Sequence, residues 1–215
     1  MNQRSTSRSK PQSMRMRMKE EARSAILDAA EQVLAEQGLH AARMDDIAAR
    51  VGVSVGTLYN YFEDRQQLLE ALRDMRGREL LALLDVELER SQRSPYRARL
   101  HGFLRCILEH SRTHFRLLSL LLENALRRDS SREGDLERHL EMWREVSLRL
   151  EHLGQQGVKE GALRPEDASH YPAMLLDMVQ GLLMRQIIAK QPAPVDELLE
   201  PLLRCFLEGA APRPG

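Results

Sequence analysis

The chain has 215 residues, of which 42% are hydrophobic and 30% are charged. This length and composition fit one large or two small globular domains and exclude a disordered chain. The 32 basic and 32 acidic residues give a formal net charge of zero. We therefore do not expect a protein that coats nucleic acid through its overall charge, although a local basic surface stays open. Only two cysteines are present, which excludes a disulfide-rich scaffold and a zinc site built from four thiolates.

Residue usage favours helices along the whole chain. Arg, Glu, Leu and Ala are frequent, aromatic residues make up only 4%, and few stretches alternate with the period of two that strands need. We therefore predict an all-α protein. No apolar run approaches the ~18 residues that cross a bilayer, and no apolar segment follows the charged N-terminus as in a secretory signal. We expect a soluble cytoplasmic protein that does not use a membrane as a partner.

Charge and hydrophobicity divide the chain into four segments. Residues 1–19 carry six cations and no acid, and we expect a flexible basic arm that acts either as a solubility tail or as a contact for phosphates. Residues 20–66 are expected to form a small helical domain and residues 67–209 a larger one. The Pro-containing residues 210–215 are expected to be a frayed tail.

The helices are expected in the following order. From Glu20, apolar residues recur with helical spacing up to Gly38, which is expected to end the first helix in the left-handed conformation. Asp64 is expected to cap a fourth helix that continues to about residue 92, with Gln67 three residues later as in a capping box. The other helices are expected over residues 44–51, 55–62, 115–127, 135–156, 166–190 and 195–207, with one more that opens at Ser94-Pro95.

Residues 44–62 form a candidate helix-turn-helix, because two short predicted helices flank a turn that contains Gly52. In that motif the second helix enters the major groove of DNA and its N-terminal residues reach the base edges. Ser54 is expected as the N-cap of this helix, and Gly56 would let the DNA approach closely. Hydroxyl and amide groups that could reach bases or phosphates belong to Thr57, Tyr59, Asn60 and Tyr61. Arg65 adds a positive charge at the start of the next helix. A helix pair with a glycine turn is, however, more often a purely structural element than a DNA-binding one.

A set of motifs over residues 20–70 closely resembles the signature of the tetracycline-repressor (TetR) family. The set comprises Ile26-Leu27-Asp28-Ala29-Ala30, the spacing Gly38 … Asp46-Ile47-Ala48, and the run Gly52-Val53-Ser54-Val55-Gly56-Thr57-Leu58-Tyr59-Asn60-Tyr61-Phe62 followed by Asp64-Arg65. The rest of the chain matches that family in layout only. The resemblance implies an N-terminal DNA-binding domain and a C-terminal domain for effector binding and dimerisation.

The resemblance also implies a function. It implies a ligand-responsive transcriptional regulator, with repression favoured over activation, that binds a palindromic operator in double-stranded DNA as a homodimer. An unknown small hydrophobic or amphipathic effector would release it, and no cofactor is implied. The implied DNA contacts fall on Arg43, Ser54, Val55, Gly56, Thr57, Tyr59, Asn60, Tyr61 and Arg65. The chain departs from the family pattern at Val55, where members commonly carry Lys or another polar residue, and at Arg43-Met44, where members often have Thr.

Two groups of residues in the larger domain are candidates for the effector pocket and the dimer interface. By resemblance, the pocket lies among the middle helices and the penultimate one, and its candidate lining residues are Phe103, Ile107, Phe115, Leu118, Met142, Trp143, Met174 and Met178. Polar groups in the pocket are expected from residues such as His110, His139, Asp177 or Gln180. Wide apolar bands on the last two helices predict dimer contacts at Leu175, Val179, Leu182, Leu183, Leu198, Leu202 and Phe206. These bands could instead be ordinary intrachain core.

His110 and His114 lie four residues apart and share a helix face, so they could chelate a metal ion. No third ligand is evident nearby in sequence and Arg112 adds repulsion, so we expect no metal site. No nucleophile motif such as G-x-S-x-G is present, and we expect no enzymatic activity. Two alternatives to a ligand-responsive regulator stay open. One is an architectural DNA-binding dimer without a ligand, and the other is a small-molecule-binding or interaction scaffold without specific DNA binding.

Overall fold

The computed structural model describes residues 14–127 and 133–210. Every regular element in these ranges is helical, which confirms the predicted fold class. None of the described helices is both long enough and apolar enough to span a membrane. The chain divides into two compact units between Leu72 and Arg73, rather than after residue 66 as the sequence predicts.

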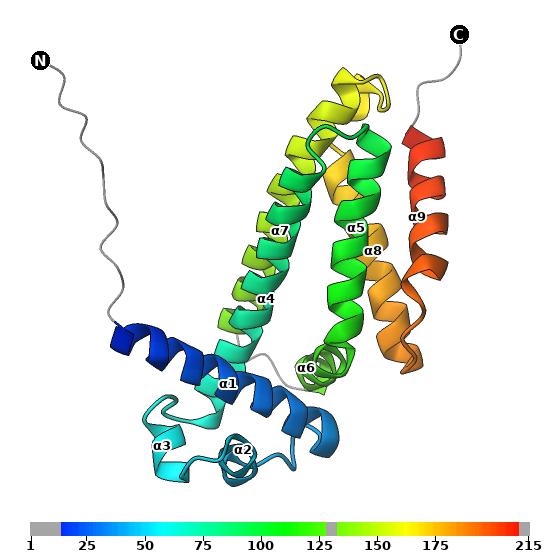
Figure 1. Ribbon diagram of the computed structural model, residues 1–215. Helices are drawn as coiled ribbons and strands as arrows, with labels where there is room; N and C mark the ends of the chain where they lie inside the picture. The colour runs from blue at the N-terminus through cyan, green and yellow to red at the C-terminus, as the bar shows by residue number, and fades with distance from the viewer. Residues whose placement is uncertain (1–13, 128–132, 211–215) are drawn as a thin grey trace, which may run out of the picture. The chain divides into compact units, whose positions relative to one another are not determined.

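The first unit is built on helices α1 (Met14–Gln37), α2 (Met44–Val51) and α3 (Val55–Tyr59), together with the first turns of α4 (Arg65–Arg90) (Figure 1). These helices bury one apolar core, whose members include Ile26, Leu27, Ala30, Val33, Leu34, Ile47, Ala48, Leu58, Phe62, Leu68 and Leu72. The guanidinium of Arg23 lies 5.2 Å from the centre of the Phe62 ring and adds a cation–π contact at the edge of this core.

The predicted basic arm is corrected in its last part, because α1 begins at Met14 rather than at Glu20. Residues 14–19 alternate Met with Arg and Lys, and all three are good helix formers, so the helix continues N-terminal to its buried stripe. The rest of the predicted arm, residues 1–13, lies outside the described residues. Residues 211–215 of the predicted tail also lie outside them, and Ala210 is the last residue of α9.

The helix ends of the first unit follow the local signals in the sequence. Gly38 and Gly52 have φ angles of 83° and 80°, which is the left-handed conformation that the sequence predicts for Gly38. The Gly38 N–H donates to the Leu34 carbonyl at 2.8 Å, and the Gly52 N–H donates to the Ala48 carbonyl at 3.0 Å. Both bonds satisfy carbonyls that the end of a helix would otherwise leave without an intrahelical donor.

The start of α4 also agrees with its predicted cap. The Asp64 carboxylate accepts a hydrogen bond from the Gln67 N–H at 2.7 Å, and the Gln67 side chain accepts one from the Glu63 N–H at 2.8 Å. In this capping box, the Gln67 side chain therefore binds the N–H of Glu63 rather than the N–H of the cap residue Asp64. This arrangement fixes where α4 begins, directly after the helix-turn-helix segment.

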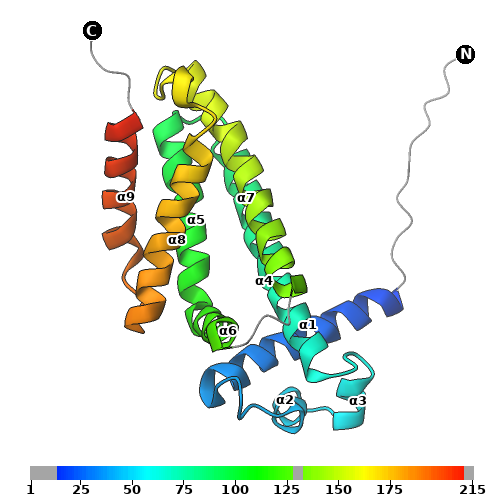
Figure 2. The ribbon, with the colours of Figure 1, turned by 180° about the vertical axis from the view of Figure 1, so that it is seen from behind.

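The second unit contains the rest of α4 and five further helices. They are α5 (Tyr96–Thr113), α6 (Phe115–Arg127), α7 (Glu133–Lys159), α8 (Tyr171–Ala189) and α9 (Val195–Ala210). Views from opposite sides both show α4 beside α7, and α5 beside α8 and α9, whereas α6 runs across the end of α5 (Figures 1 and 2). The core shared by α4, α5, α7, α8 and α9 includes Leu84, Leu100, Phe103, Leu104, Ile107, Val146, Leu153, Val179, Leu199 and Leu203.

The helix predicted over residues 166–190 is corrected at its start. A short 3-10 turn covers Pro165–Asp167, and α8 begins only at Tyr171. The physical reason is Pro172, which lacks an N–H and clashes with a preceding helical turn, so it fits in the first turn of a helix but not in its interior. The apolar face that α8 brings to the core therefore starts at Tyr171.

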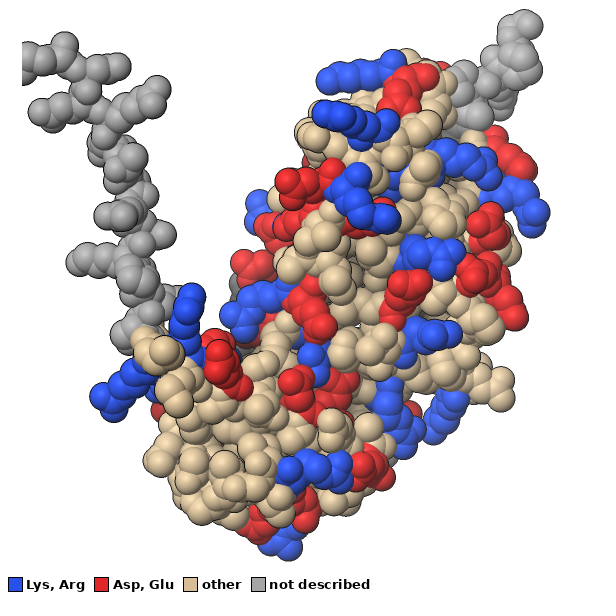
Figure 3. Space-filling view, in the orientation of Figure 1, with Lys and Arg blue, Asp and Glu red and all other residues tan. Residues whose placement is uncertain are grey.

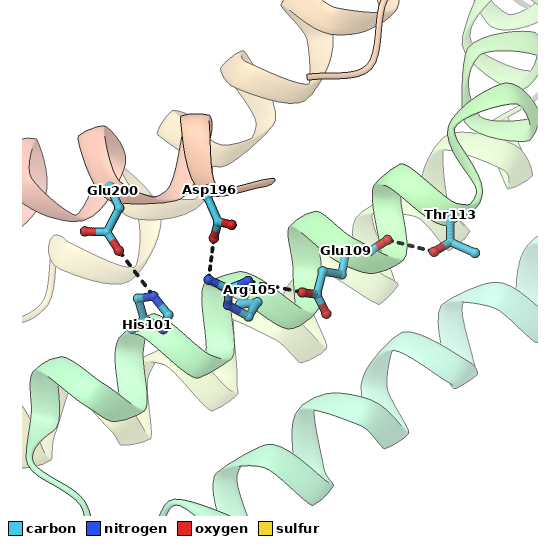
Figure 4. A network of polar contacts seen from close by, with 6 residues as sticks. All are labelled: His101, Arg105, Glu109, Thr113, Asp196 and Glu200. Carbon is cyan, nitrogen blue, oxygen red and sulfur yellow. Dashed lines mark hydrogen bonds and ion pairs between the residues drawn. The ribbon is translucent and has the colours of Figure 1, made fainter. Parts of the chain in front are cut away.

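Polar contacts between helices fix their register in the second unit. The Arg149 guanidinium on α7 donates to both Asp85 oxygens on α4, at 2.7 and 2.9 Å. On the opposite side, α5 and α9 are joined by the pair Arg105–Asp196 and by the His101 ring, which lies 3.4 Å from the Glu200 carboxylate (Figure 4). The polar face of α9 is therefore tied to α5 of the same chain.

Candidate nucleic-acid interface

The turn between α2 and α3 is stabilised by its own side chains. The Ser54 hydroxyl accepts a hydrogen bond from the Thr57 N–H at 3.0 Å and lies 2.8 Å from the Thr57 hydroxyl. Ser54 is thus the N-cap of α3, as the sequence predicts. Because Ser54 holds both the backbone and the side chain of Thr57, the start of α3 has one defined orientation.

Helix α3 is shorter than predicted, because it ends at Tyr59 rather than at Phe62. The N–H groups of Tyr61 and Phe62 both donate to the Leu58 carbonyl, at 3.0 and 3.1 Å, so the chain leaves the helix through a tight turn. The residues Tyr59–Phe62 are weak helix formers, and the cap of α4 follows at once. The turn keeps Leu58 and Phe62 in the core.

The side chains of this segment separate into a buried and an exposed set. Leu58 and Phe62 are buried, whereas Tyr59 is 48% exposed and Asn60 is also exposed. Val55, Thr57 and Tyr61 are half-buried. The residues singled out by the sequence for contact with bases therefore lie on the outer side of the segment.

Gly56 marks a place where another molecule can come close to the backbone. It is exposed on α3, and a Cβ atom built there would have only the Ser54 hydroxyl within 4 Å, at 3.9 Å. Its backbone is in an ordinary helical conformation, so neither strain nor internal packing requires a glycine at this position. The lack of a side chain leaves open space on the outside of the helix.

The charges around the segment are arranged in ion pairs rather than in a basic patch. Residues 51–62 contain no charged residue, and residues 14–72 contain seven basic and ten acidic ones. Arg50 forms hydrogen bonds with both carboxylate oxygens of Glu36, and these bonds lower the pKa of the Glu36 carboxyl. On the face seen in Figure 3, basic and acidic side chains are interspersed. Attraction by a broad positive surface is therefore weak, and contacts of individual groups matter more.

The two arginines singled out by the sequence differ in their surroundings. Arg43 is exposed, its guanidinium lies 3.8 Å from the Asp45 carboxylate, and its N–H donates to Asp46 at 3.3 Å at the start of α2. Arg65 is half-buried, and one nitrogen of its guanidinium is out of contact with solvent. Arg43 is thus better placed than Arg65 to reach a phosphate without a rearrangement.

The candidate pocket residues are distributed unevenly. Phe103 and Ile107 are fully buried in the second unit, whereas Met174 is 55% exposed. The remaining candidates are half-buried: Phe115, Leu118, Met142, Trp143 and Met178. Met174 therefore does not line an interior space, because its place on α8 turns it to solvent.

Of the polar groups expected in the pocket whose side chains the structure describes, His110 is buried. Asp177 and Gln180 are exposed and cannot supply polarity to an interior space as they stand. The side chain of His139 lies outside the described residues.

The dimer residues expected from the last two helices are corrected in part. The chain itself buries Leu175, Val179, Leu202 and Phe206 in the core of the second unit, and Leu182, Leu183 and Leu198 are half-buried against that core. The physical reason is that the buried faces of α8 and α9 pack on α5 and α7 of the same chain. The large apolar residues that α8 leaves exposed are Met174, Met184 and Ile188.

One group that the sequence analysis missed lies beside the two histidines. Glu79, on α4, brings a carboxylate oxygen to 3.9 Å from His110 Nε2 and 3.8 Å from His114 Nε2. The expectation that no third ligand is available was limited to residues nearby in sequence. Glu79 directly precedes Leu80, which belongs to the apolar stripe of α4. This position in the sequence is the signal that could have found Glu79.

Comparisons with known proteins agree with this geometry. Residues 26–72 match the sequence model of the TetR N-terminal domain, which describes bacterial regulatory proteins of the tetR family. YhgD of Bacillus subtilis (strain 168), an uncharacterized HTH-type transcriptional regulator, is 26% identical over 183 residues, which cover 85% of this chain and 92% of that protein.

Two solved structures show the same fold. A TetR transcription regulator from Haloarcula marismortui ATCC 43049 has a TM-score of 0.72 at 21% identity, over 89% of this chain and 98% of that one. The transcriptional regulator FadR from Bacillus subtilis, in complex with stearoyl-CoA, has a TM-score of 0.69 at 19% identity, over 86% of this chain and 98% of that one.

The fold and the helix-turn-helix define the class of protein as a DNA-binding transcriptional regulator. Residues 26–72 form a domain that matches the tetR family of bacterial regulatory proteins. It is a regulator rather than an enzyme.

Proposed function

We propose that this regulator is a ligand-responsive repressor that binds a palindromic operator as a homodimer and leaves it when a small molecule binds to the second unit. The observation that carries the proposal is the outer side of residues 54–61. It combines exposed hydroxyl and amide groups with an open backbone position at Gly56 and contains no charge. Such a surface suits reading of base edges, for which hydrogen-bond geometry rather than net charge provides discrimination.

Each exposed group has a role in this proposal. The Asn60 amide both donates and accepts, so it can pair with adenine in the major groove, and the Tyr59 hydroxyl can reach a base or a phosphate. Val55 can make only apolar contact, for example with a thymine methyl group. Arg43, with its guanidinium exposed, contacts a phosphate and sets the position of the motif on the duplex.

The proposed effector is hydrophobic or amphipathic. The half-buried residues Phe115, Met142, Trp143 and Met178 supply large apolar side chains, and methionines adapt to ligands of varied shape. The complex of Bacillus subtilis FadR with stearoyl-CoA supports this class of ligand for a chain of the same fold. A ligand that binds one arrangement of the second unit more tightly lowers operator affinity by its difference in affinity for the two arrangements.

The proposed dimer uses the exposed face of α8. Met174, Gly181, Met184 and Ile188 share that face at helical spacing, and Ile188 is 71% exposed. Gly181 has no heavy atom within 4 Å of the position its Cβ would take, so it leaves room for a close approach by another helix. A second copy of the chain would cover these apolar side chains by symmetry.

The proposal is tested by selecting bound sequences from random double-stranded DNA with the full chain, and by repeating the selection with Asn60→Ala. We expect a palindromic consensus for the wild-type protein. Asn60→Ala should cost about 1–3 kcal/mol at that site and relax the preference at one base position in each half-site. Gln155→Ala, an exposed amide on α7, is the matched control and should leave both the consensus and the affinity unchanged.

Three outcomes would contradict parts of the proposal. An equal loss by Asn60→Ala on all sequences would contradict base reading by this residue. A selection without any consensus would favour the scaffold without specific DNA binding. Operator binding that persists while apolar ligands such as long-chain acyl-CoA and fatty acids raise the melting temperature would contradict release by an effector.

A further inference from the structure

We propose that Glu79, His110 and His114 bind a divalent transition-metal ion, with Zn²⁺ as the representative, and that the ion links α4 to α5. The three residues offer one carboxylate oxygen and two imidazole nitrogens, and these ligand atoms all lie within 4.8 Å of one another. Two neutral imidazoles and one carboxylate are a ligand set that Zn²⁺ uses in proteins when a fourth position stays open.

The distances fit one ion shared by three ligands. Both histidine Nε2 atoms face the same Glu79 oxygen, at 3.9 Å from His110 and 3.8 Å from His114. These separations are too long for hydrogen bonds. Two ligands at 2.0–2.2 Å from one zinc ion lie no more than about 4.3 Å apart, and about 3.4 Å apart in a tetrahedral site. The two distances from histidine nitrogen to carboxylate oxygen are therefore within about half an ångström of the tetrahedral value.

The local structure positions the two rings before any ion binds. His110 lies in the last turn of α5 and His114 is its C-cap residue, so the helix itself sets their spacing. Their ring centres are 4.6 Å apart, and the two histidine side chains are only 8% and 9% exposed. The Glu79 side chain is 44% exposed, which leaves a path for an ion from solvent.

One neighbouring charge opposes the ion. The Arg76 guanidinium lies 3.0 Å from the same Glu79 oxygen and pairs with it. An ion must share this oxygen with Arg76 or displace the guanidinium, and two positive charges this close repel each other. The site should therefore have a lower affinity than the three ligands alone would provide, and Arg76 becomes a sensitive test of the proposal.

The ion would act on a helix that also belongs to the DNA-binding unit. Helix α4 begins at Arg65, in the first unit, and Glu79 lies farther along the same helix in the second. An ion that fixes Glu79 to α5 would favour one position of α4 and would thereby change operator affinity. This second step rests on the proposed function, whereas binding of the ion does not.

The site is tested first without DNA, on the full chain stripped of metal. Titration with Zn²⁺ should give one ion per chain, and Co²⁺ should give the visible absorption of a site with nitrogen and oxygen ligands. Glu79→Gln, which keeps the shape of the side chain, and His114→Gln should each weaken binding by about tenfold or more. Arg76→Gln should strengthen it, because the competing charge is gone.

His101→Gln is the matched control, because His101 is on the same helix and also lies beside a glutamate, on the α9 side (Figure 4). It should bind Zn²⁺ like the wild-type protein. An unchanged melting temperature of metal-free Glu79→Gln shows that this variant is folded. Absence of a 1:1 complex in the wild-type chain, or equal affinity in Glu79→Gln and the wild type, would overturn the site.

Operator binding with and without Zn²⁺ tests the second step separately. A change in operator affinity for the wild-type protein that Glu79→Gln lacks would support coupling through α4. Equal operator affinity with and without a bound ion would overturn the coupling. Failure of the protein to bind any operator both with and without Zn²⁺ would count against the proposed function instead and would leave the titration result unaffected.

Discussion

Replacing Gly56 by Ala separates the folding of α3 from its approach to DNA. The position is helical, has no positive φ angle, and offers a Cβ atom no neighbour closer than the Ser54 hydroxyl at 3.9 Å. The added methyl group is therefore accommodated without strain in the free protein. Since alanine favours a helix over glycine, Gly56→Ala should raise the free energy of unfolding, by up to roughly 0.5–1 kcal/mol.

The same methyl group should weaken binding to DNA. If the operator contacts the backbone at Gly56, the methyl group fills the space that a base or a sugar-phosphate group needs. Inserting one methyl group into a close-packed contact typically costs about 1–3 kcal/mol. Such a loss corresponds to a decrease in operator affinity of about 5- to 150-fold. Stability and DNA affinity should therefore change in opposite directions.

The measurement combines urea unfolding with fluorescence anisotropy on the selected operator. Gly209→Ala is the matched control, because Gly209 is also exposed and helical and has nothing within 4 Å of its Cβ position, but lies on α9 in the second unit. It should leave DNA affinity unchanged. Wild-type operator affinity in Gly56→Ala would refute a close approach of DNA at this position. A loss of stability would refute the conclusion that the site is open.

Two further predictions concern the second unit. Met184→Glu combined with Ile188→Glu should give folded monomers in sedimentation at micromolar concentration, because both side chains are exposed in the single chain. Val86→Glu is the control, because Val86 is exposed on α4, and this variant should stay dimeric. A dimeric double variant would exclude this face of α8 as the interface. Asp85→Asn should lower the free energy of unfolding at neutral pH by no more than about 1 kcal/mol, because it removes the ion pair with Arg149 and the Asp85 side chain is 58% exposed. The hydrogen bonds from Arg149 lower the pKa of Asp85 below its ordinary value of 3.8. The stabilisation by this pair is therefore present above pH 3.8 and is lost as the pH falls through the lowered pKa. If the free energy of unfolding of Asp85→Asn differed from that of the wild type by the same amount from neutral to acid pH, this assignment would be contradicted.

Local rules explain why the first unit could be predicted from the sequence. Gly38, Gly52, Ser54 and Asp64 each act within four residues of their own position, through a φ angle or a single cap hydrogen bond. Such signals do not depend on the rest of the fold. The end of α3 could not be placed in the same way, because weak helix formers compete there with the cap of the next helix.

The second unit depends on contacts between distant residues, which periodicity does not reveal. The bands containing Val179 and Leu202 have helical spacing whether their partner is the same chain or a second copy, and the structure shows that the same chain covers them. Met174 also follows the helical pattern, yet it is on the exposed face of α8. Glu79 was missed because a ligand set is defined by distance in space, and α4 is distant in sequence from His110.

The distribution of charge indicates how affinity and specificity divide between parts of the first unit. Residues 51–62 contain no charge, so they contribute little to the sequence-independent attraction between basic residues and phosphates. Arg50 is paired with Glu36. The described cations best able to provide that attraction are therefore Arg43 and, at the start of α1, Arg15, Arg17 and Lys19. If affinity rests on these groups, base selection rests on the neutral groups of α3 and the turn after it. A substitution at Asn60 then changes which sequence is bound, whereas a substitution at Arg43 changes how tightly all sequences are bound.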